Sequence, residues 1–509
     1  MTRITWYALA VVAVAVGIRV YDAASTYVNP DEAMHFIAAN TPSTWETYRN
    51  SLTTAHPPLF LLVLHWIMQL GSTELMMRLP NLVAGSVALW LAFRWLQRAM
   101  GDAIALAGLI FLAGAPAMIA VSNEVRQYGL LLLGVCGALY CMERVAAQRS
   151  AAWVGAFAVS LYVAIVSHYT AAGVVLTLGI YVPWRLWQER VPVSVGVAWV
   201  VSQCGAAALY TWLYATHLRG LRGGGMEAAA VSGWLQHAYY RPGYHSVAQF
   251  CWNAFDGAFR YLVGAASLGV LTVALFLVGV VLISVGKAGD RGARRDYAVL
   301  LTLPLLFGCA AAVWGLLPFG ATRHVGVILP FVAAGVAVSV ASAVRHRPTL
   351  VLLVGCVVLP AWLWWTAPPN DPRQMARGEM QAALDYLTTA VPEGSVVMVD
   401  GQTHLVLLYY LDREAKGPRV TRHGPINETA LVGRRLFSFQ DSWGFSADQV
   451  ESQTRALAER LALPAGEPVW IMSIGWDHPP FDSLLTPTAA PIRKHFGDIT
   501  LVQTAVGYL

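Results

Sequence analysis

The sequence predicts a polytopic α-helical membrane protein with a small C-terminal α/β domain. Of its 509 residues, 57% are hydrophobic and only 12% are charged, about half the charged fraction of a soluble globular protein. Apolar runs long enough to cross a bilayer as helices recur as far as residue 366. Beyond residue 367 the apolar runs become short and are bounded by polar residues, as in a soluble domain. We therefore expect a membrane module over residues 1–366 and an α/β domain over residues 367–509.

Eleven apolar segments have the length of a membrane span. The run from Pro57 to Leu70 is shorter, which suits a helix lying at the membrane surface. The predicted spans cover residues 4–22, 78–98, 103–121, 128–147, 152–168, 170–187, 193–214, 260–285, 297–317, 325–344 and 349–366.

The arginines between these spans predict the orientation of the chain. With the N-terminus in the cytoplasm and no span at Pro57–Leu70, every short outside loop carries one arginine or none, as the positive-inside rule requires. We therefore expect the first outer loop (residues 23–77) and the C-terminal domain to lie on the outer side. The expected location is a bacterial inner membrane, where that side is the periplasm. The inside loops then contain Arg94, Arg98, Arg144, Arg149, Arg185, Arg190, Lys287, Arg291, Arg294, Arg295, Arg345 and Arg347.

The first outer loop begins with an acidic motif, Asn29-Pro30-Asp31-Glu32. Pro30 suits the first turn of a helix, and Asn29 before it suits the N-cap. A helix starting there would place Asp31 and His35 on one face, four residues apart. A solvated acidic cap on a surface helix is the alternative interpretation.

The predicted topology brings further ionisable residues to the same outer face. Such residues at membrane depth are costly and are usually functional, although Arg78 and Arg126 also suit interfacial anchors whose charged ends reach the headgroups. Together the group suits a substrate with a phosphate at headgroup level, because guanidinium groups bind phosphate bidentately and a carboxylate can accept a proton. The group consists of Asp31, Glu32, His35, His56, Arg78, Arg126, His168, Arg323 and His324.

Several short motifs carry a resemblance to a known family. The chain resembles the GT-C glycosyltransferases, and within them the family-39-type enzymes related to protein mannosyltransferases and aminoarabinose transferases. The resemblance covers roughly residues 1–345 and rests on Asn29-Pro30-Asp31-Glu32-Ala33, His56-Pro57-Pro58-Leu59-Phe60, Arg78-Leu79-Pro80-Asn81, Asn123-Glu124-Val125-Arg126-Gln127-Tyr128, Ser167-His168-Tyr169 and Thr322-Arg323-His324.

The resemblance implies a GT-C fold and an inverting transfer of a sugar from a polyprenyl-phosphate donor. The acceptor, a lipid, a glycan or a protein, would be used at the outer face. The acidic residue of the family's first loop corresponds to Asp31, the candidate base, with Glu32 as second choice. The aminoarabinose transferases have a Lys-Pro motif where this chain has His56-Pro57, which leaves more of the phosphate charge to Arg126 and Arg323. The implied substrate-binding residues are His35, His56, Arg78, Arg126, Tyr128, His168, Arg323 and His324.

The chemistry requires no cofactor, because the leaving group is already an anion and needs electrostatic stabilisation that arginines can supply. A divalent cation can supply the same stabilisation, and Asp31, His35 and His56 are the candidate ligands. No nucleic-acid partner is expected, because the net charge is only +5 and the arginines are dispersed.

Two soluble segments complete the prediction. Residues 215–258 form a long outer loop with the glycine run Gly223–Gly225, which suits either a mobile flap over a site or a flexible linker. The C-terminal domain starts after the Pro-rich segment 368–372, with a helix at Gln374–Leu387 and strands at Ser395–Val399 and Val469–Ile474. We assign this domain to packing or to acceptor recognition.

A transporter or flippase for a lipid-linked sugar, or a non-catalytic protein that binds one, would share the span count and the outer-face charges. Transporters usually carry their ionisable residues near the middle of the membrane, on broken helices. Here the span interiors are nearly free of Asp, Glu and Lys. This distribution favours an interfacial enzyme.

Overall fold

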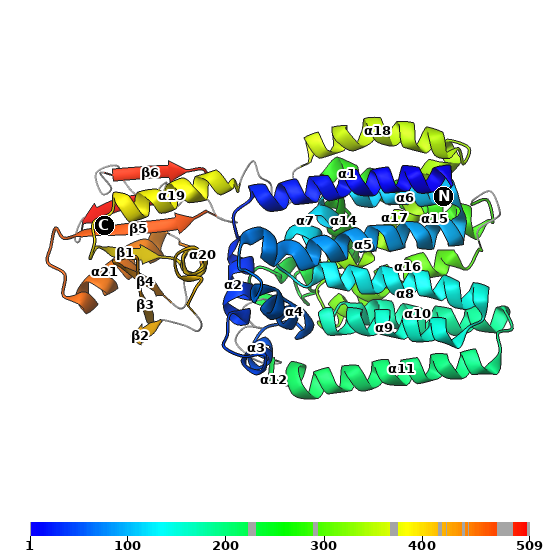
Figure 1. Cartoon of the computed structure of the whole chain (residues 1–509), viewed down its shortest axis with the longest axis horizontal. Coiled ribbons are helices and arrows are strands. Elements are labelled where there is room, and N and C mark those ends of the chain that lie inside the picture. Colours follow the sequence, from blue (N-terminus) through cyan, green and yellow to red (C-terminus); the bar gives the residue numbers. More distant parts are fainter. Residues whose placement is uncertain are drawn as a thin grey trace. The chain divides into compact units, whose positions relative to one another are not determined.

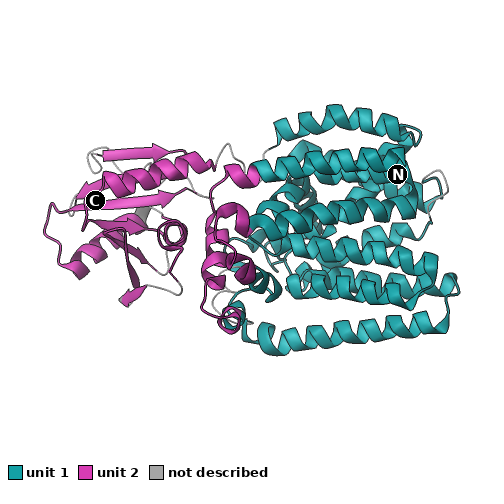
Figure 2. Ribbon diagram, in the orientation of Figure 1, with its two compact units in different colours: residues 1–21, 48–63, 78–369 teal, residues 22–47, 64–77, 370–509 magenta. Residues whose placement is uncertain are grey.

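The computed structural model describes residues 2–221, 231–288, 294–366, 375–415, 420–423, 425–439, 443–445, 447–475 and 492–505. The chain forms two compact units (Figure 2). Unit 1 contains residues 1–21, 48–63 and 78–369, and unit 2 contains residues 22–47, 64–77 and 370–509. Most of the predicted first outer loop therefore groups with the C-terminal domain rather than with the membrane module. The Pro-rich segment 368–372 lies outside the described residues.

Long apolar helices run side by side in unit 1 (Figure 1). The antiparallel pair α8–α9 and the pairs α15–α17 and α6–α17 form its main helix contacts. The helices that lie wholly or partly in unit 1 are α1 (Arg3–Ser25), α3 (Thr44–Ser51), α4 (Leu59–Met68), α5 (Glu74–Met100), α6 (Asp102–Gly114), α7 (Pro116–Asn123), α8 (Tyr128–Gln148), α9 (Ala151–Ser167), α10 (Ala171–Gln188), α11 (Val193–Leu213), η1 (Tyr214–Leu218), α12 (Arg219–Leu221), η2 (Gln236–Ala238), α14 (Val247–Val263), α15 (Ala266–Ser284), α16 (Tyr297–Val313), η3 (Arg323–Ile328), α17 (Leu329–Ala343) and α18 (Pro348–Trp365).

Among the described residues, seven helices are long and apolar enough to cross a membrane. An eighth span results if α6 and α7, which are bent by 63° at their break, count as one. Each of the eleven predicted segments contains a helix, but α9 and α16 have only 17 residues each. Helix α10 does not meet the criterion of length and hydropathy either, so this criterion counts fewer spans than the eleven predicted segments. The multi-pass membrane character of the chain is confirmed.

The predicted span 260–285 is divided in the structure. Gly264 ends α14 with a left-handed backbone conformation, φ +78°, which glycine adopts without steric cost. Only α15, from Ala266 to Ser284, has the length and composition of a span. Helix α14 occupies the end of the predicted loop 215–258 and buries Phe250, Phe259 and Leu262 along one side. The glycine run in that loop lies outside the described residues.

A close approach of two helices supports the core of unit 1. At Gly279 of α15, an added Cβ would overlap the backbone carbonyl of Gly335 in α17. Small residues allow helix backbones to approach closely in membrane proteins, where packing replaces the hydrophobic effect as the main attraction between helices. The α15–α17 contact therefore depends on glycine at both positions.

A buried ion pair joins three helices of unit 1. Arg185 of α10 donates to both carboxylate oxygens of Glu143 in α8, over 2.6 and 2.7 Å, and to the Tyr297 hydroxyl of α16 over 2.8 Å. The sequence predicts Arg185 in an inside loop, but in the structure its side chain is buried. The bidentate geometry and the additional hydroxyl satisfy the charges, which makes burial of the pair tolerable.

Unit 2 contains a seven-stranded mixed sheet with the order β2-β3-β4-β1-β5-β7-β6. Strand β1 is parallel to β4 and β5, and the other pairs are antiparallel. The predicted helix and both predicted strands correspond to α19, β1 and β5. The elements are α2 (Pro30–Ala39), α19 (Arg377–Thr389), β1 (Val396–Val399), α20 (Gly401–Asp412), β2 (Thr421–His423), β3 (Ile426–Leu431), β4 (Arg434–Phe439), α21 (Ala447–Leu461), β5 (Pro468–Ile474), β6 (Ile492–Phe496) and β7 (Ile499–Ala505).

Candidate functional site

The acidic motif forms the first turn of helix α2, in unit 2. Asn29 is the N-cap: its side chain accepts a hydrogen bond from Glu32 N over 2.9 Å, and Glu32 Oε2 accepts one from Asn29 N over 3.0 Å. This reciprocal capping box, with Pro30 in the first turn, confirms the predicted start of the helix. Glu32 is fully buried in this arrangement. The carboxylate of Glu32 therefore has a structural task in capping the start of the helix.

Asp31 immediately precedes Glu32 in the same turn and is 9% exposed. His35 follows one turn later, and its Nδ1 is 2.7 Å from the carbonyl oxygen of Asp31. A carbonyl oxygen only accepts, so His35 carries a proton on Nδ1. The expected placement of Asp31 and His35 one helical turn apart is confirmed.

In unit 1, five other predicted residues gather around the ring of His168. We call this group the histidine–arginine cluster. The His168 ring centroid lies 5.0 Å from that of Tyr128, 5.4 Å from that of His56 and 5.5 Å from that of His324. These residues come from the loop before α4, the start of α8, the α9–α10 connection and η3. The cluster contains His56, Arg126, Tyr128, His168, Arg323 and His324.

Two arginines supply the positive charge of this cluster. Nη2 of Arg126 is 3.5 Å from Nε2 of His56, and the guanidinium lies 5.8 Å from the Tyr128 ring centroid. Nη1 of Arg323 is 3.7 Å from Oε2 of Glu124. Both arginines act electrostatically on His168. The charges of two arginines about 200 residues apart in sequence thus act on one imidazole, and the carboxylate of Glu124 lies beside one of them.

His168 is neutral at physiological pH. It lies in the connection between α9 and α10, where burial above all, and then the charges of Arg126 and Arg323, lower the pKa of its imidazole to about 3. Its Nδ1 accepts from Thr170 N over 3.1 Å and contacts the Thr170 hydroxyl at 2.9 Å. Because a backbone amide can only donate, the proton of the neutral ring is on Nε2.

The Nε2–H group of His168 is buried and has no hydrogen-bond partner among the residues that the structure describes. Buried donors are almost always paired, so an unpaired one at a charged cluster indicates a site for an acceptor that binds there. With two arginines beside it, the favoured acceptor is an anion.

Asn81 fixes the chain that carries Arg126. From α5, its side-chain amide donates to the backbone carbonyls of Glu124 and Arg126, in the short segment between α7 and α8. The sequence motifs contain Asn81 and Glu124, but their roles were not predicted because both depend on a contact between segments more than 40 residues apart. Arg78, one turn before Asn81, is buried in α5 of the same unit.

A second support holds the loop that carries His56. His217, in the π-helical turn η1 at the end of α11, donates from Nε2 to the carbonyl of Thr54 over 2.7 Å. Its Nδ1 is 2.6 Å from the Tyr169 hydroxyl. Short π-helical turns are frequent at functional sites. A lone histidine at the end of a span gave no sequence signal for this role.

The predicted residues thus divide between the two units. The cluster and Arg78 belong to unit 1, whereas Asp31, Glu32 and His35 belong to unit 2. The candidate metal ligands divide in the same way, with His56 in unit 1. Within the described parts of the chain, no group of three or more His, Cys, Asp or Glu side chains is arranged to hold a metal ion.

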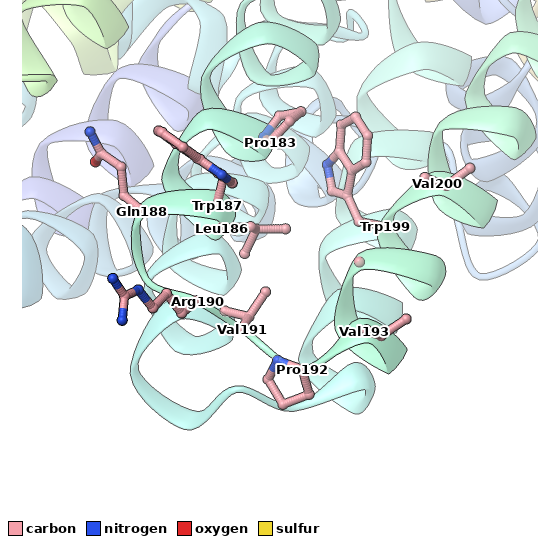
Figure 3. Close-up of a pocket in the computed structure, with 11 residues that line it drawn as sticks. Pro183, Leu186, Trp187, Gln188, Arg190, Val191, Pro192, Val193, Trp199 and Val200 are labelled. Carbon is pink, nitrogen blue, oxygen red and sulfur yellow. The ribbon is translucent and has the colours of Figure 1, made fainter.

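A surface pocket of about 750 Å³ lies between α10 and α11 (Figure 3). Its walls include Leu186, Trp187 and Trp199, with Arg190 at the connection between the two helices. These residues lie at the end of α10, whereas His168 precedes its start. The histidine–arginine cluster and this pocket are therefore at different ends of α10, and we place the candidate site at the cluster.

Comparison with known proteins supports the fold. Residues 55–214 match the family model described as dolichyl-phosphate-mannose-protein mannosyltransferase. The apo structure of ArnT from Cupriavidus metallidurans is similar over 99% of this chain and 98% of that chain, with 16% sequence identity and a TM-score of 0.52. No curated protein matches in sequence.

Two further solved structures are more distant by TM-score. ArnT from the same organism bound to undecaprenyl phosphate has a TM-score of 0.49, with 14% identity over 100% of this chain and 99% of that chain. The S. cerevisiae Pmt1–Pmt2 complex bound to its sugar donor has a TM-score of 0.35, with 16% identity over 42% of this chain and 33% of that chain. The full-length likeness to apo ArnT shows that this chain has the GT-C fold of membrane glycosyltransferases, which confirms the predicted fold class.

Proposed function

We propose that the protein is an inverting membrane glycosyltransferase that moves a sugar from a polyprenyl-phosphate donor to a hydroxyl group of a lipid, glycan or protein. The observation that carries this proposal is the buried Nε2–H of His168 without a partner among the described residues, beside Arg126 and Arg323. A neutral imidazole donor and two guanidinium groups suit a phosphate. The GT-C fold and the mannosyltransferase family match support a lipid-linked sugar as its source.

The cluster would act on the leaving group. As the bond between the anomeric carbon and the phosphate oxygen breaks, its electron pair remains on the phosphate. Arg126, Arg323 and His168 would stabilise the charge that develops there, which preorganised donors in a buried site do efficiently. This scheme requires no cofactor, and a divalent cation could share the same charge.

Asp31 is proposed as the base that accepts the proton of the acceptor hydroxyl while its oxygen bonds to the anomeric carbon. Attack opposite the leaving phosphate inverts the configuration at that carbon. The capping box supports the choice of Asp31 over Glu32, because the Glu32 carboxylate already accepts the Asn29 amide. A flippase would need charged groups along a pathway, whereas the cluster lies at helix ends and in connections.

Donor binding tests this proposal before any transfer is measured. We expect purified protein in detergent to bind a polyprenyl phosphate and to bind the matching polyprenol, which lacks the phosphate, at least tenfold more weakly, because charge-assisted hydrogen bonds to the phosphate would be lost. Binding can be measured by the shift in thermal unfolding temperature that each lipid produces. Equal shifts with both lipids would contradict an anion site.

The proposal also requires unit 2 to lie at the outer side of the membrane. The arginine distribution predicts that it lies in the periplasm. A single cysteine introduced at the exposed position Ala382 of α19, in a variant without the six natural cysteines, should react with a membrane-impermeant maleimide in intact spheroplasts. A cysteine at the exposed position 149, on the predicted cytoplasmic side, serves as the control and should react only after lysis. The reverse pattern would contradict the topology.

A further inference from the structure

Helix α20 of the C-terminal domain holds the chain on which the acidic helix α2 is built. The hydroxyl of Tyr410 accepts a hydrogen bond from Val28 N over 3.0 Å and donates to Oε1 of Glu74 over 2.5 Å. Val28 directly precedes Asn29, the N-cap of α2. The hydroxyl of Tyr410 therefore fixes the residue before the N-cap of α2 and, through Glu74, the start of α5.

The neighbouring Tyr409 makes a parallel set of contacts. Its hydroxyl donates to the carbonyl of Ser72 over 2.9 Å, and its ring meets Phe36 of α2 edge-on, with ring centroids 5.0 Å apart. Both tyrosines come from the last turns of α20. Together they contact Val28, Phe36, Ser72 and Glu74. Aromatic edge-to-face contacts and buried hydrogen bonds of this kind fix geometry as well as adding stability.

Further contacts anchor α2 at both ends. Before the helix, the Tyr27 hydroxyl donates to Oδ2 of Asp498 over 2.7 Å, in the turn between β6 and β7. After the helix, the Asn40 side chain donates to the carbonyl of Ala415, just beyond α20, over 2.9 Å. Helices α2 and α20 pack directly against each other. The C-terminal domain therefore contacts α2 from its entry to its end.

We propose that Tyr410 is a positioning residue, and that holding α2, and with it Asp31, is the task of the C-terminal domain. This inference rests on the proposed role of Asp31 as base. Its physical warrant is that catalytic groups must be held within a fraction of an ångström, since a misplacement of about 1 Å can cost about 100-fold in rate. The Val28 amide is three residues from Asp31. Loss of the hydroxyl that accepts its hydrogen bond would therefore loosen the chain directly before the first turn of α2.

The test is Tyr410→Phe, which removes the hydroxyl and keeps the ring. We expect kcat for sugar transfer to fall about 10- to 100-fold, while the KM for the donor changes less than about twofold because the variant leaves the histidine–arginine cluster intact. Tyr386→Phe on α19 is the matched control, since Tyr386 contacts Trp470 and Phe496 through its ring, and it should leave kcat unchanged. An unchanged kcat in Tyr410→Phe would overturn the inference.

A double variant separates positioning from a general loss of structure. In the Asp31→Asn background, Tyr410→Phe should change the residual transfer rate less than about twofold, because a residue that acts through Asp31 has nothing left to position. Equal losses in both backgrounds would mean that Tyr410 acts elsewhere, and would overturn the inference.

Hydrogen exchange gives a readout that does not depend on catalysis. In Tyr410→Phe, the amides of residues 28–36 should exchange at least tenfold faster than in the wild type, while those of β1 and β5 should not change. Unchanged exchange in α2 would overturn the positioning role even if Asp31 is the base. Retained transfer in Asp31→Asn, with faster exchange in Tyr410→Phe, would instead contradict the proposed base and leave the contact itself established.

Discussion

Replacing Asp31 with asparagine is expected to reduce sugar transfer by 10²- to 10⁴-fold, the usual contribution of a general base. Asparagine keeps the shape of the side chain but has no oxygen that accepts a proton at neutral pH. The helix should persist, because its cap is formed by Asn29 and Glu32. Donor binding should persist as well, because the anion site belongs to unit 1. The measurement is transfer from a polyprenyl-phosphate sugar by the purified variant, with donor-induced thermal stabilisation measured beside it.

Glu32→Gln is the matched control for this variant. A glutamine retains a side-chain oxygen that can accept the hydrogen bond from Asn29 N, so the cap weakens by at most about 1 kcal/mol. We expect transfer by Glu32→Gln to stay close to the wild-type rate. If Asp31→Asn keeps more than about a tenth of the wild-type turnover, or if Glu32→Gln is the more damaged of the two, Asp31 is not the base.

Replacing Arg126 or Arg323 with lysine is expected to weaken donor binding about tenfold each, the equivalent of about 1.4 kcal/mol. Lysine keeps the positive charge but loses the planar fork that binds two phosphate oxygens at once. Arg126 should be the more sensitive position, because it is 5% exposed and lies over the Tyr128 ring, whereas Arg323 already faces the carboxylate of Glu124.

Arg98→Lys provides a control for the general effect of such a change. Arg98 lies in the last turn of α5 and contacts the Tyr140 ring, away from the histidine–arginine cluster. Its replacement should leave donor affinity unchanged. Both arginines act on His168, so their effects on donor affinity should not be independent. In the combined Arg126→Lys and Arg323→Lys variant, the loss of donor affinity should therefore differ from the product of the two single losses. Wild-type donor affinity in both single variants would rule out the proposed phosphate site.

The sequence by itself determined the class of this protein. The length of the apolar runs and the low charge predict membrane helices, because a bilayer core requires about 20 apolar residues per span. Each of the eleven predicted segments contains a helix, and the composition change after residue 366 predicts the α/β domain that the structure contains. These properties are local: a span, an N-cap such as Asn29 or a buried strand such as β5 can be recognised from a short stretch of residues.

The short motifs also predicted which residues would gather, because the predicted orientation of the spans brings their ends to one face. Five of the six members of the histidine–arginine cluster were named in this way, and the sixth, Tyr128, was named through the family resemblance. Their arrangement around His168, the tautomer fixed by Thr170 and the support from Asn81 and His217 could not be predicted, since each depends on contacts between distant segments.

Only the tertiary structure decided how the acidic loop is held. Nothing near residue 31 in the sequence indicates that α2 packs on α20, nearly 400 residues later, or that Glu32 closes a buried cap while Asp31 does not serve as the N-cap. The same holds for the glycine stop at Gly264, which divides the predicted span 260–285, and for the burial of Arg185. Apolar length and charge balance act locally along the chain, whereas the roles of Tyr410, Glu32 and Arg185 are set by the partners that packing brings to them.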